Sequence, residues 1–85
     1  MPRYYFHTHN GSGSSFDEEG QELPDIHAAR REALRGIRSI VSEEAQSGEV
    51  DLRGRLDVAG GDGGVLFTVQ YDEAIQVRRR EEARP

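Results

Sequence analysis

A single long amphipathic pattern in the middle of the chain limits the possible folds more than any other feature. From Asp25 to about Ser47 the apolar residues recur at helical spacing, and at about 100° per residue they fall within an arc of about 140°. Asp25 is a good N-cap residue, and Gly48 stands where a helix C-cap glycine belongs. We therefore predict one helix with a core-facing stripe, made of Ile26, Ala29, Ala33, Leu34, Ile37, Ile40 and Val41.

The segment before this helix has the pattern of a β-hairpin. In RYYFHTH, alternation puts Tyr4, Phe6 and Thr8 on one face of a strand. The opposite face would carry Arg3, Tyr5, His7 and His9. The following NGSGSS has a reverse-turn composition, so we expect residues 15–17 to return as a short partner strand with Phe16 packed inward.

A second hairpin is predicted after the helix. The stretch LRGRLDVAGGDGGVLFTVQY contains two alternating runs joined by a turn rich in glycine and aspartate. One face of the first strand would carry Leu52, Leu56 and Val58, and one face of the second Val65, Phe67, Val69 and Tyr71. We expect both faces to meet the helix stripe.

Together these patterns predict an α+β fold in the order ββαββ, an antiparallel sheet of two hairpins with one amphipathic helix packed on one face. The 85 residues fit one domain, which we place at residues 1–77. Residues 78–85, RRREEARP, are a mixed-charge run that cannot pack, and we expect them to form a disordered tail.

Composition and charge exclude several classes of protein. The chain has no cysteine, which rules out a disulfide framework and thiol chemistry. A net charge of -5 disfavours a general binder of nucleic acids, whose phosphates are neutralised by lysine and arginine. The start, MPRYYFH, has no apolar stretch long enough for a signal peptide or a membrane span, so we expect a cytoplasmic protein without membrane contact.

Two histidines on one strand face raise the question of a metal site. His7 and His9 point the same way and could share a divalent ion with an oxygen from Asp17, Glu18 or Glu19. The alternative is a plain hairpin, in which His7 is partly buried and hydrogen-bonded to the backbone or to an acid, and His9 is exposed. We favour the hairpin, so we predict no metal site and no cofactor.

The chain shows no arrangement that predicts catalysis. Ser12, Ser14 and Ser15 lie in a glycine-rich loop, where a nucleophile would not be held in place. Two small hairpins around one helix also leave no deep pocket for a substrate. We therefore predict no catalytic residue, no small-molecule substrate and no enzyme.

Two surfaces remain as candidates for binding. On the helix, an arc of about 80° away from the core carries four basic side chains, which could bind nucleic-acid phosphates or an acidic partner. We call it the arginine ridge, and it consists of His27, Arg31, Arg35 and Arg38. Alternatively, its arginines are solvated or pair with nearby acids. The second surface is the open sheet face with Arg3, Tyr5, His7 and His9, which a monomer would rarely leave bare.

Several motifs resemble a family of small bacterial proteins of unknown function. Its members begin Met-Pro-Arg-Tyr-Phe-Phe-His and continue with Asp-x-x-Gly-x-Glu-Leu before an alanine- and arginine-rich helix. The matching stretches here are MPRYYFH, DEEGQELPD, AARREAL and VLFTVQY, up to about Val77. The GSGSS loop is longer than in the family, and Asn10 stands where an aspartate is usual. The resemblance implies the fold and no activity.

The first strand, turn, second strand and helix are also similar to the opening unit of antitoxins of the HicA-HicB type, which neutralise a small RNase toxin. We expect an interaction module that binds a protein partner or a second copy of itself as a homodimer, through the sheet face or a sheet edge. The alternative is a weak nucleic-acid-binding or antitoxin-like regulator that uses the arginine ridge.

Overall fold

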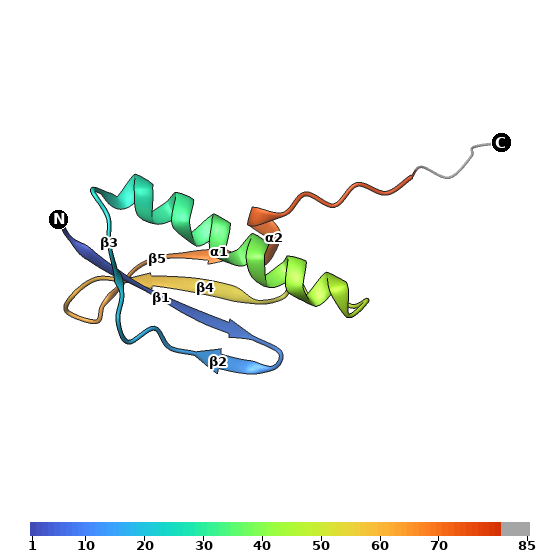
Figure 1. Cartoon of the computed structure of the whole chain (residues 1–85), viewed down its shortest axis with the longest axis horizontal. Helices are drawn as coiled ribbons and strands as arrows, with labels where there is room; N and C mark the ends of the chain where they lie inside the picture. The colour runs from blue at the N-terminus through green and yellow to red at the C-terminus, as the bar shows by residue number, and fades with distance from the viewer. Residues whose placement is uncertain (81–85) are drawn as a thin grey trace.

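The computed structural model describes residues 1–80, and it consists of an antiparallel sheet with one long helix along one face (Figure 1). The strand order is β2-β1-β4-β5, and a fifth, two-residue strand, β3, pairs with the start of β1. This confirms the α+β class, although β3 and the one-turn helix α2 are added to the predicted ββαββ order. The elements are β1 (Arg3–Asn10), β2 (Gly13–Ser15), β3 (Gln21–Glu22), α1 (Ile26–Gln46), β4 (Arg55–Ala59), β5 (Val65–Gln70) and α2 (Tyr71–Ala74).

Helix α1 begins and ends where its capping residues predict. The Asp25 side chain accepts a hydrogen bond from the Ala28 backbone N–H at 2.9 Å, which satisfies one free donor of the first turn. After the C-cap at Ser47, Gly48 has φ +91°, the left-handed conformation that glycine adopts without strain. The predicted caps at both ends are therefore confirmed.

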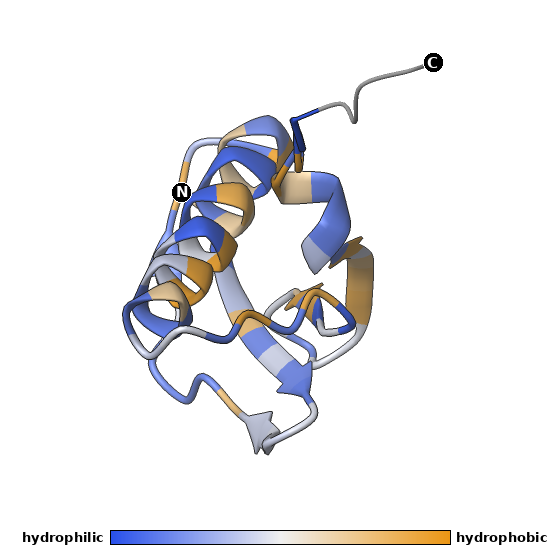
Figure 2. Ribbon diagram, turned by 90° about the vertical axis from the view of Figure 1, so that its right-hand side faces the viewer, coloured by the Kyte–Doolittle hydropathy of each residue, from blue (hydrophilic) through white to orange (hydrophobic). Residues whose placement is uncertain are grey.

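The core lies between α1 and the facing side of the sheet, and Figure 2 shows the apolar residues of the helix turned toward the strands. From the predicted stripe, Ala29, Ala33 and Ile37 are completely buried. On the sheet, Phe6 pairs with Val58, which in turn pairs with Phe67. Ile26 departs from the stripe and is 45% exposed. The first turn of the helix lies beside Phe67 of β5, the last strand of the sheet, and no described strand lies beyond β5 to cover Ile26.

Tyr71 closes the core at the end of β5. Its side chain is completely buried, as predicted, but it belongs to α2 and not to the strand. Its backbone N–H donates to the Gly54 carbonyl at 2.9 Å, and a Cβ on Gly54 would lie only 2.7 Å from the Tyr71 ring. Glycine at position 54 therefore makes room for the largest fully buried side chain of the core.

The predicted inward packing of Phe16 is wrong. Strand β2 has only three residues, and Ser15 pairs with Thr8, which lies on the helix side of β1. Side chains alternate along an extended chain, so the next residue, Phe16, falls on the opposite side. Its ring is 65% exposed and lies against His7 and His9.

The second hairpin also differs from the prediction at both ends. Val65 was expected in the core but is 57% exposed, because the register shifts at Val58 and Ala59, so that Ala59 pairs with Val65. Leu52 packs against the core from the loop before β4, whose first residue is Arg55.

Beyond α2 the chain runs away from the sheet without regular structure up to residue 80 (Figure 1). The rest of the predicted tail, residues 81–85, lies outside the described residues. Within the described part, no helix is long and apolar enough to cross a membrane.

Candidate functional site

A polar cluster occupies the sheet face away from α1. Cross-strand pairing puts His9 of β1 opposite Ser14 of β2 on one side and opposite Arg55 of β4 on the other. Asp57, two residues along β4, pairs with Thr68 of β5. We call these five side chains, which come from four neighbouring strands, the His9 cluster.

Both ring nitrogens of His9 have a polar partner. Nδ1 lies 2.7 Å from the Ser14 hydroxyl oxygen, and Nε2 lies 3.2 Å from Oδ2 of Asp57. The His9 side chain is only 19% exposed, so the prediction that it is exposed is wrong. The reason is that β1 is not an edge strand: β2 and β4 flank it on both sides.

The carboxylate of Asp57 is the most buried charged group of the described residues, with 9% of the residue exposed. Its Oδ1 accepts a hydrogen bond from Thr68 Oγ1 at 2.7 Å and lies 3.4 Å from Arg55 Nε. Its Oδ2 faces His9. A buried carboxylate needs such partners, because an unpaired charge is costly away from water.

His7 makes a different contact, and the prediction of a partly buried, hydrogen-bonded residue is confirmed. Its Nδ1 accepts a hydrogen bond from the Asp17 backbone N–H at 3.0 Å. The Asp17 carboxylate in turn accepts hydrogen bonds from the backbone N–H groups of Phe6, Glu19 and Gly20. Partial burial alone would raise the pKa of Asp17, but these hydrogen bonds outweigh it and lower the pKa below its ordinary value.

Both histidine rings pack against Phe16. The Phe16 ring centroid lies 5.4 Å from that of His7 and 5.6 Å from that of His9. Among residues 1–80, no three histidine, aspartate or glutamate side chains are grouped so that they could hold a metal ion.

The segment after β2 folds over the start of the open face. Arg3 donates to the Glu19 carbonyl at 2.8 Å and to Glu22 Oε2 at 3.0 Å. Gly20, with φ +72°, lies so close to Tyr5 that a Cβ would be 2.8 Å from the ring. The four residues predicted for this face therefore have different neighbours: Arg3, Tyr5 and His7 contact the 17–22 segment, and the rings of His7 and His9 contact Phe16.

The arginine ridge keeps its place on the helix surface, but two of its four side chains have intramolecular partners. Arg35 donates from Nε and Nη2 to the Glu32 carboxylate at 3.1 and 2.8 Å, and this side-chain hydrogen bonding raises the pKa of Arg35. Arg38 donates to the Ala74 carbonyl at 2.9 Å and so ties α1 to α2. Arg31 is exposed, and His27 borders the groove described next.

A shallow apolar groove of about 260 Å³ lies where the first turn of α1 meets β5, lined by Ile26, His27, Arg30 and Phe67. Strand β5 itself pairs with β4 on one side, and no described strand pairs with its other side. Figure 2 shows the apolar colouring of β5 at the border of the fold.

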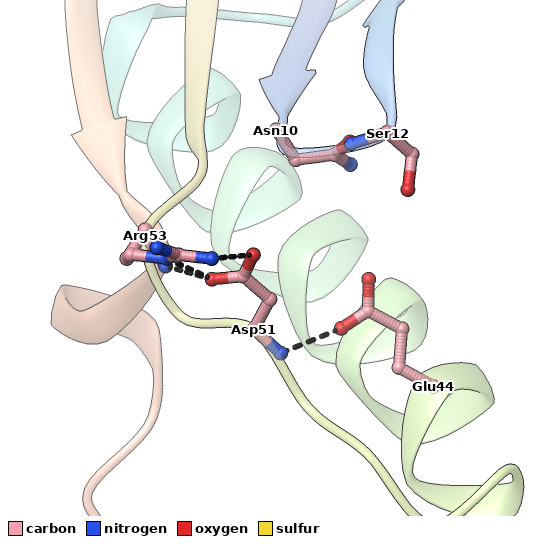
Figure 3. Close-up of polar contacts among 5 residues, drawn as sticks. All are labelled: Asn10, Ser12, Glu44, Asp51 and Arg53. Atoms are coloured by element: carbon pink, nitrogen blue, oxygen red, sulfur yellow. Dashed lines mark hydrogen bonds and ion pairs between the residues drawn. The ribbon is translucent and has the colours of Figure 1, made fainter.

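A second, acidic hollow of about 340 Å³ is lined by Ser12, Glu44, Ser47, Glu49 and Asp51. Figure 3 shows that two of its carboxylates, those of Glu44 and Asp51, make contacts that hold the loop between α1 and β4. The Asp51 backbone N–H donates to Glu44 at 3.1 Å, and the Asp51 carboxylate accepts two side-chain hydrogen bonds from Arg53 at 2.9 and 3.0 Å. Hydrogen bonding to Arg53 lowers the pKa of Asp51 to about 2. The carboxylates of Glu44 and Asp51 therefore have a structural role, which is to hold the loop between α1 and β4.

These features define a small α+β protein in which the long helix α1 covers one sheet face and the other face carries the polar His9 cluster. The chain matches the family described as a domain of unknown function, DUF6894, over residues 3–72, and it belongs to that family. Neither the comparison with curated proteins nor the comparison with solved structures gave a match.

Sequence reasoning missed most of the His9 cluster. Alternation alone would have put Arg55, Asp57 and Thr68 on the polar face of the second hairpin. The pairing of β1 with β4, which brings this face beside His9, has no local signal, because the two strands are separated by the whole helix.

Proposed function

We propose that this protein is an interaction module that associates with a second copy of itself through strand β5. The observation that carries the proposal is the composition of this edge. The sequence VLFTVQ has no charged residue and no proline, and Val65 and Leu66 are 57% and 50% exposed. Charges and prolines are the usual means by which natural proteins keep an edge strand from pairing with another chain.

Self-pairing suits this edge better than pairing with a charged partner. In an antiparallel pair related by a two-fold axis, each strand lies opposite itself, and like charges facing each other would be destabilising. The uncharged β5 avoids this repulsion. Such an axis, perpendicular to the sheet, also puts α1 of both copies on the same side, so that Ile26 and Phe67 of each copy border the seam.

The affinity should be modest. Six residues of strand and the groove beside it cover less than a standard interface of about 1,600 Å². We therefore expect a dissociation constant in the micromolar range, at about 8 kcal/mol of association free energy. This is the affinity of a reversible dimer, whose population depends on protein concentration.

The test is sedimentation velocity of the full chain at concentrations from about 1 µM to 1 mM, which brackets the expected affinity. The sedimentation coefficient should rise from the monomer to the dimer value. Leu66→Lys should keep the protein monomeric, because it puts a charge on the exposed, uncharged edge of both copies. Val50→Lys is the matched control: Val50 is 40% exposed, lies outside the sheet and should leave the dimer intact.

A wild-type chain that stays monomeric up to the highest concentration refutes self-association. Equal loss of the dimer in Leu66→Lys and Val50→Lys would show that association depends on net charge and not on the β5 edge. If the chain stays monomeric but β5 binds an added extended peptide, the partner of this edge is a different protein.

A further inference from the structure

The His9 cluster contains three side chains whose contacts run in series from an exposed hydroxyl to a buried carboxylate. Ser14, His9 and Asp57 are joined in series, by 2.7 Å between Ser14 Oγ and His9 Nδ1 and by 3.2 Å between His9 Nε2 and Asp57 Oδ2. We propose that Ser14 is a nucleophile activated by His9, and that it accepts the acyl group of small activated esters. This goes beyond the proposed self-association and does not depend on it.

The direction of the hydrogen bonds follows from Asp57. A carboxylate only accepts hydrogen bonds, so the imidazole proton of neutral His9 lies on Nε2, where it faces Asp57. Nδ1 is then unprotonated and accepts the hydrogen bond of the Ser14 hydroxyl. A nucleophile bonded to a base that a third group orients is the arrangement by which serine hydrolases are recognised on unrelated folds. In the serine-protease triad the histidine Nε2 bonds the serine and Nδ1 faces the aspartate, whereas in this protein Nδ1 bonds Ser14 and Nε2 faces Asp57.

The third group is itself held in place. Thr68 donates to Asp57 Oδ1 at 2.7 Å, and Arg55 lies 3.4 Å from the same oxygen, so Oδ2 is left for His9. Asp57 is therefore a positioning residue, which fixes the orientation and the tautomer of His9. The prediction that Ser14 and Ser15 lie in a loop is wrong: both belong to β2, where pairing with β1 holds Ser14 opposite His9.

The surroundings indicate which acyl groups fit. Phe16 lies edge-on to His9 and is 65% exposed, so it offers an apolar surface beside the imidazole. Ser14 is on the exposed strand β2, which leaves it open to solvent and to a substrate. The exposed Phe16 ring therefore favours apolar acyl groups over charged ones.

The reaction step is acyl transfer. Ser14 Oγ attacks the ester carbonyl carbon and forms a new C–O bond, while Nδ1 of His9 takes the hydroxyl proton. The bond between the acyl carbon and the alcohol oxygen breaks, and the alkoxide leaves with the bonding electron pair. With p-nitrophenyl acetate the products are O-acetyl-Ser14 and p-nitrophenolate, and the imidazolium proton passes to solvent.

The experiment measures acetylation of each serine by p-nitrophenyl acetate, using quenched digests of the full chain and mass spectrometry. Ser12 and Ser15 are internal controls, because they flank Ser14 in the same molecule. General-base catalysis contributes about 100-fold or more, so Ser14 should be acetylated about 100-fold faster than either neighbour. A fluorophosphonate probe, which loses fluoride and leaves a stable phosphonyl group, should label the same residue.

Variants separate catalysis from structure. His9→Gln should reduce acetylation of Ser14 to the rate of Ser12 and Ser15. Asp57→Asn should reduce it as well, and long-range proton–nitrogen NMR spectra should show that the imidazole proton leaves Nε2, a change that loss of packing alone would not produce. Amide spectra establish that each variant is folded.

Equal acetylation of the three serines in the wild-type chain overturns the proposal. So does a fast Ser14 whose rate is unchanged in a folded His9→Gln chain. If a variant does not fold, the acetylation rate of Ser14 relative to Ser12 and Ser15 in the wild-type chain is by itself enough to show whether Ser14 is activated.

Discussion

Replacing Gly54 by alanine tests whether the core is as closely packed around Tyr71 as the structure indicates. The added Cβ would lie 2.7 Å from Cε2 of Tyr71 and 2.9 Å from both Cδ2 and Cζ, where real Cβ atoms are essentially never found. The ring cannot retreat, because Tyr71 is completely buried. Overpacking of this kind costs about 1 to 3 kcal/mol, so Gly54→Ala should lower the free energy of unfolding by that amount.

The measurement is urea unfolding followed by far-ultraviolet circular dichroism. Gly61→Ala is the matched control: its Cβ would meet no atom within 4 Å and its φ is not positive, so its free energy of unfolding should be unchanged or slightly higher. Tyr71→Leu removes the ring that the new Cβ would touch, so Gly54→Ala should cost less in that background. A loss below about 0.5 kcal/mol in the wild-type background would refute the steric argument.

Three further predictions concern single polar groups. The Tyr71 hydroxyl is buried without a hydrogen-bond partner in residues 1–80, so Tyr71→Phe should leave the free energy of unfolding unchanged or raise it by about 1 kcal/mol in the same urea assay. Asp25→Ala removes the N-cap hydrogen bond and should cost about 1 kcal/mol, whereas an unchanged midpoint would show that the cap contributes nothing. The pKa of Asp17 is lowered from 3.8, so its contribution to the free energy of unfolding is fully present above pH 3.8 and is lost as the pH falls through the lower folded-state pKa. Between about pH 5 and 2, the free energy of unfolding should therefore depend less on pH in Asp17→Asn than in the wild-type chain.

Local sequence signals predicted the helix and the alternation of its flanking strands. The cap at Asp25, the glycine at position 48 and the inward positions of Leu56, Val58 and Val69 all follow from patterns within a few residues. Such patterns act before any tertiary contact forms, and for this reason a single sequence reveals them.

The His9 cluster and the side of Phe16 depend on information that is not local. Which strand lies beside β1 is decided by the packing of the whole helix, and the register of β2 is decided by the two-residue turn at Gly11 and Ser12. A shift of one residue moves every side chain to the other face. The prediction for Phe16 failed on this point, since the register of β2 could not be read from GSGSS.

Thr68 connects the two proposals and also makes them separable. Its backbone belongs to the β5 edge, where a second copy would pair, and its hydroxyl holds Asp57 of the His9 cluster. Thr68→Val keeps the shape of the side chain and a strand-favouring residue on the edge, so the dimer should persist. The hydrogen bond to Asp57 is lost, so acetylation of Ser14 should slow. Loss of the dimer together with the acetylation would instead show that both depend on one rigid β5.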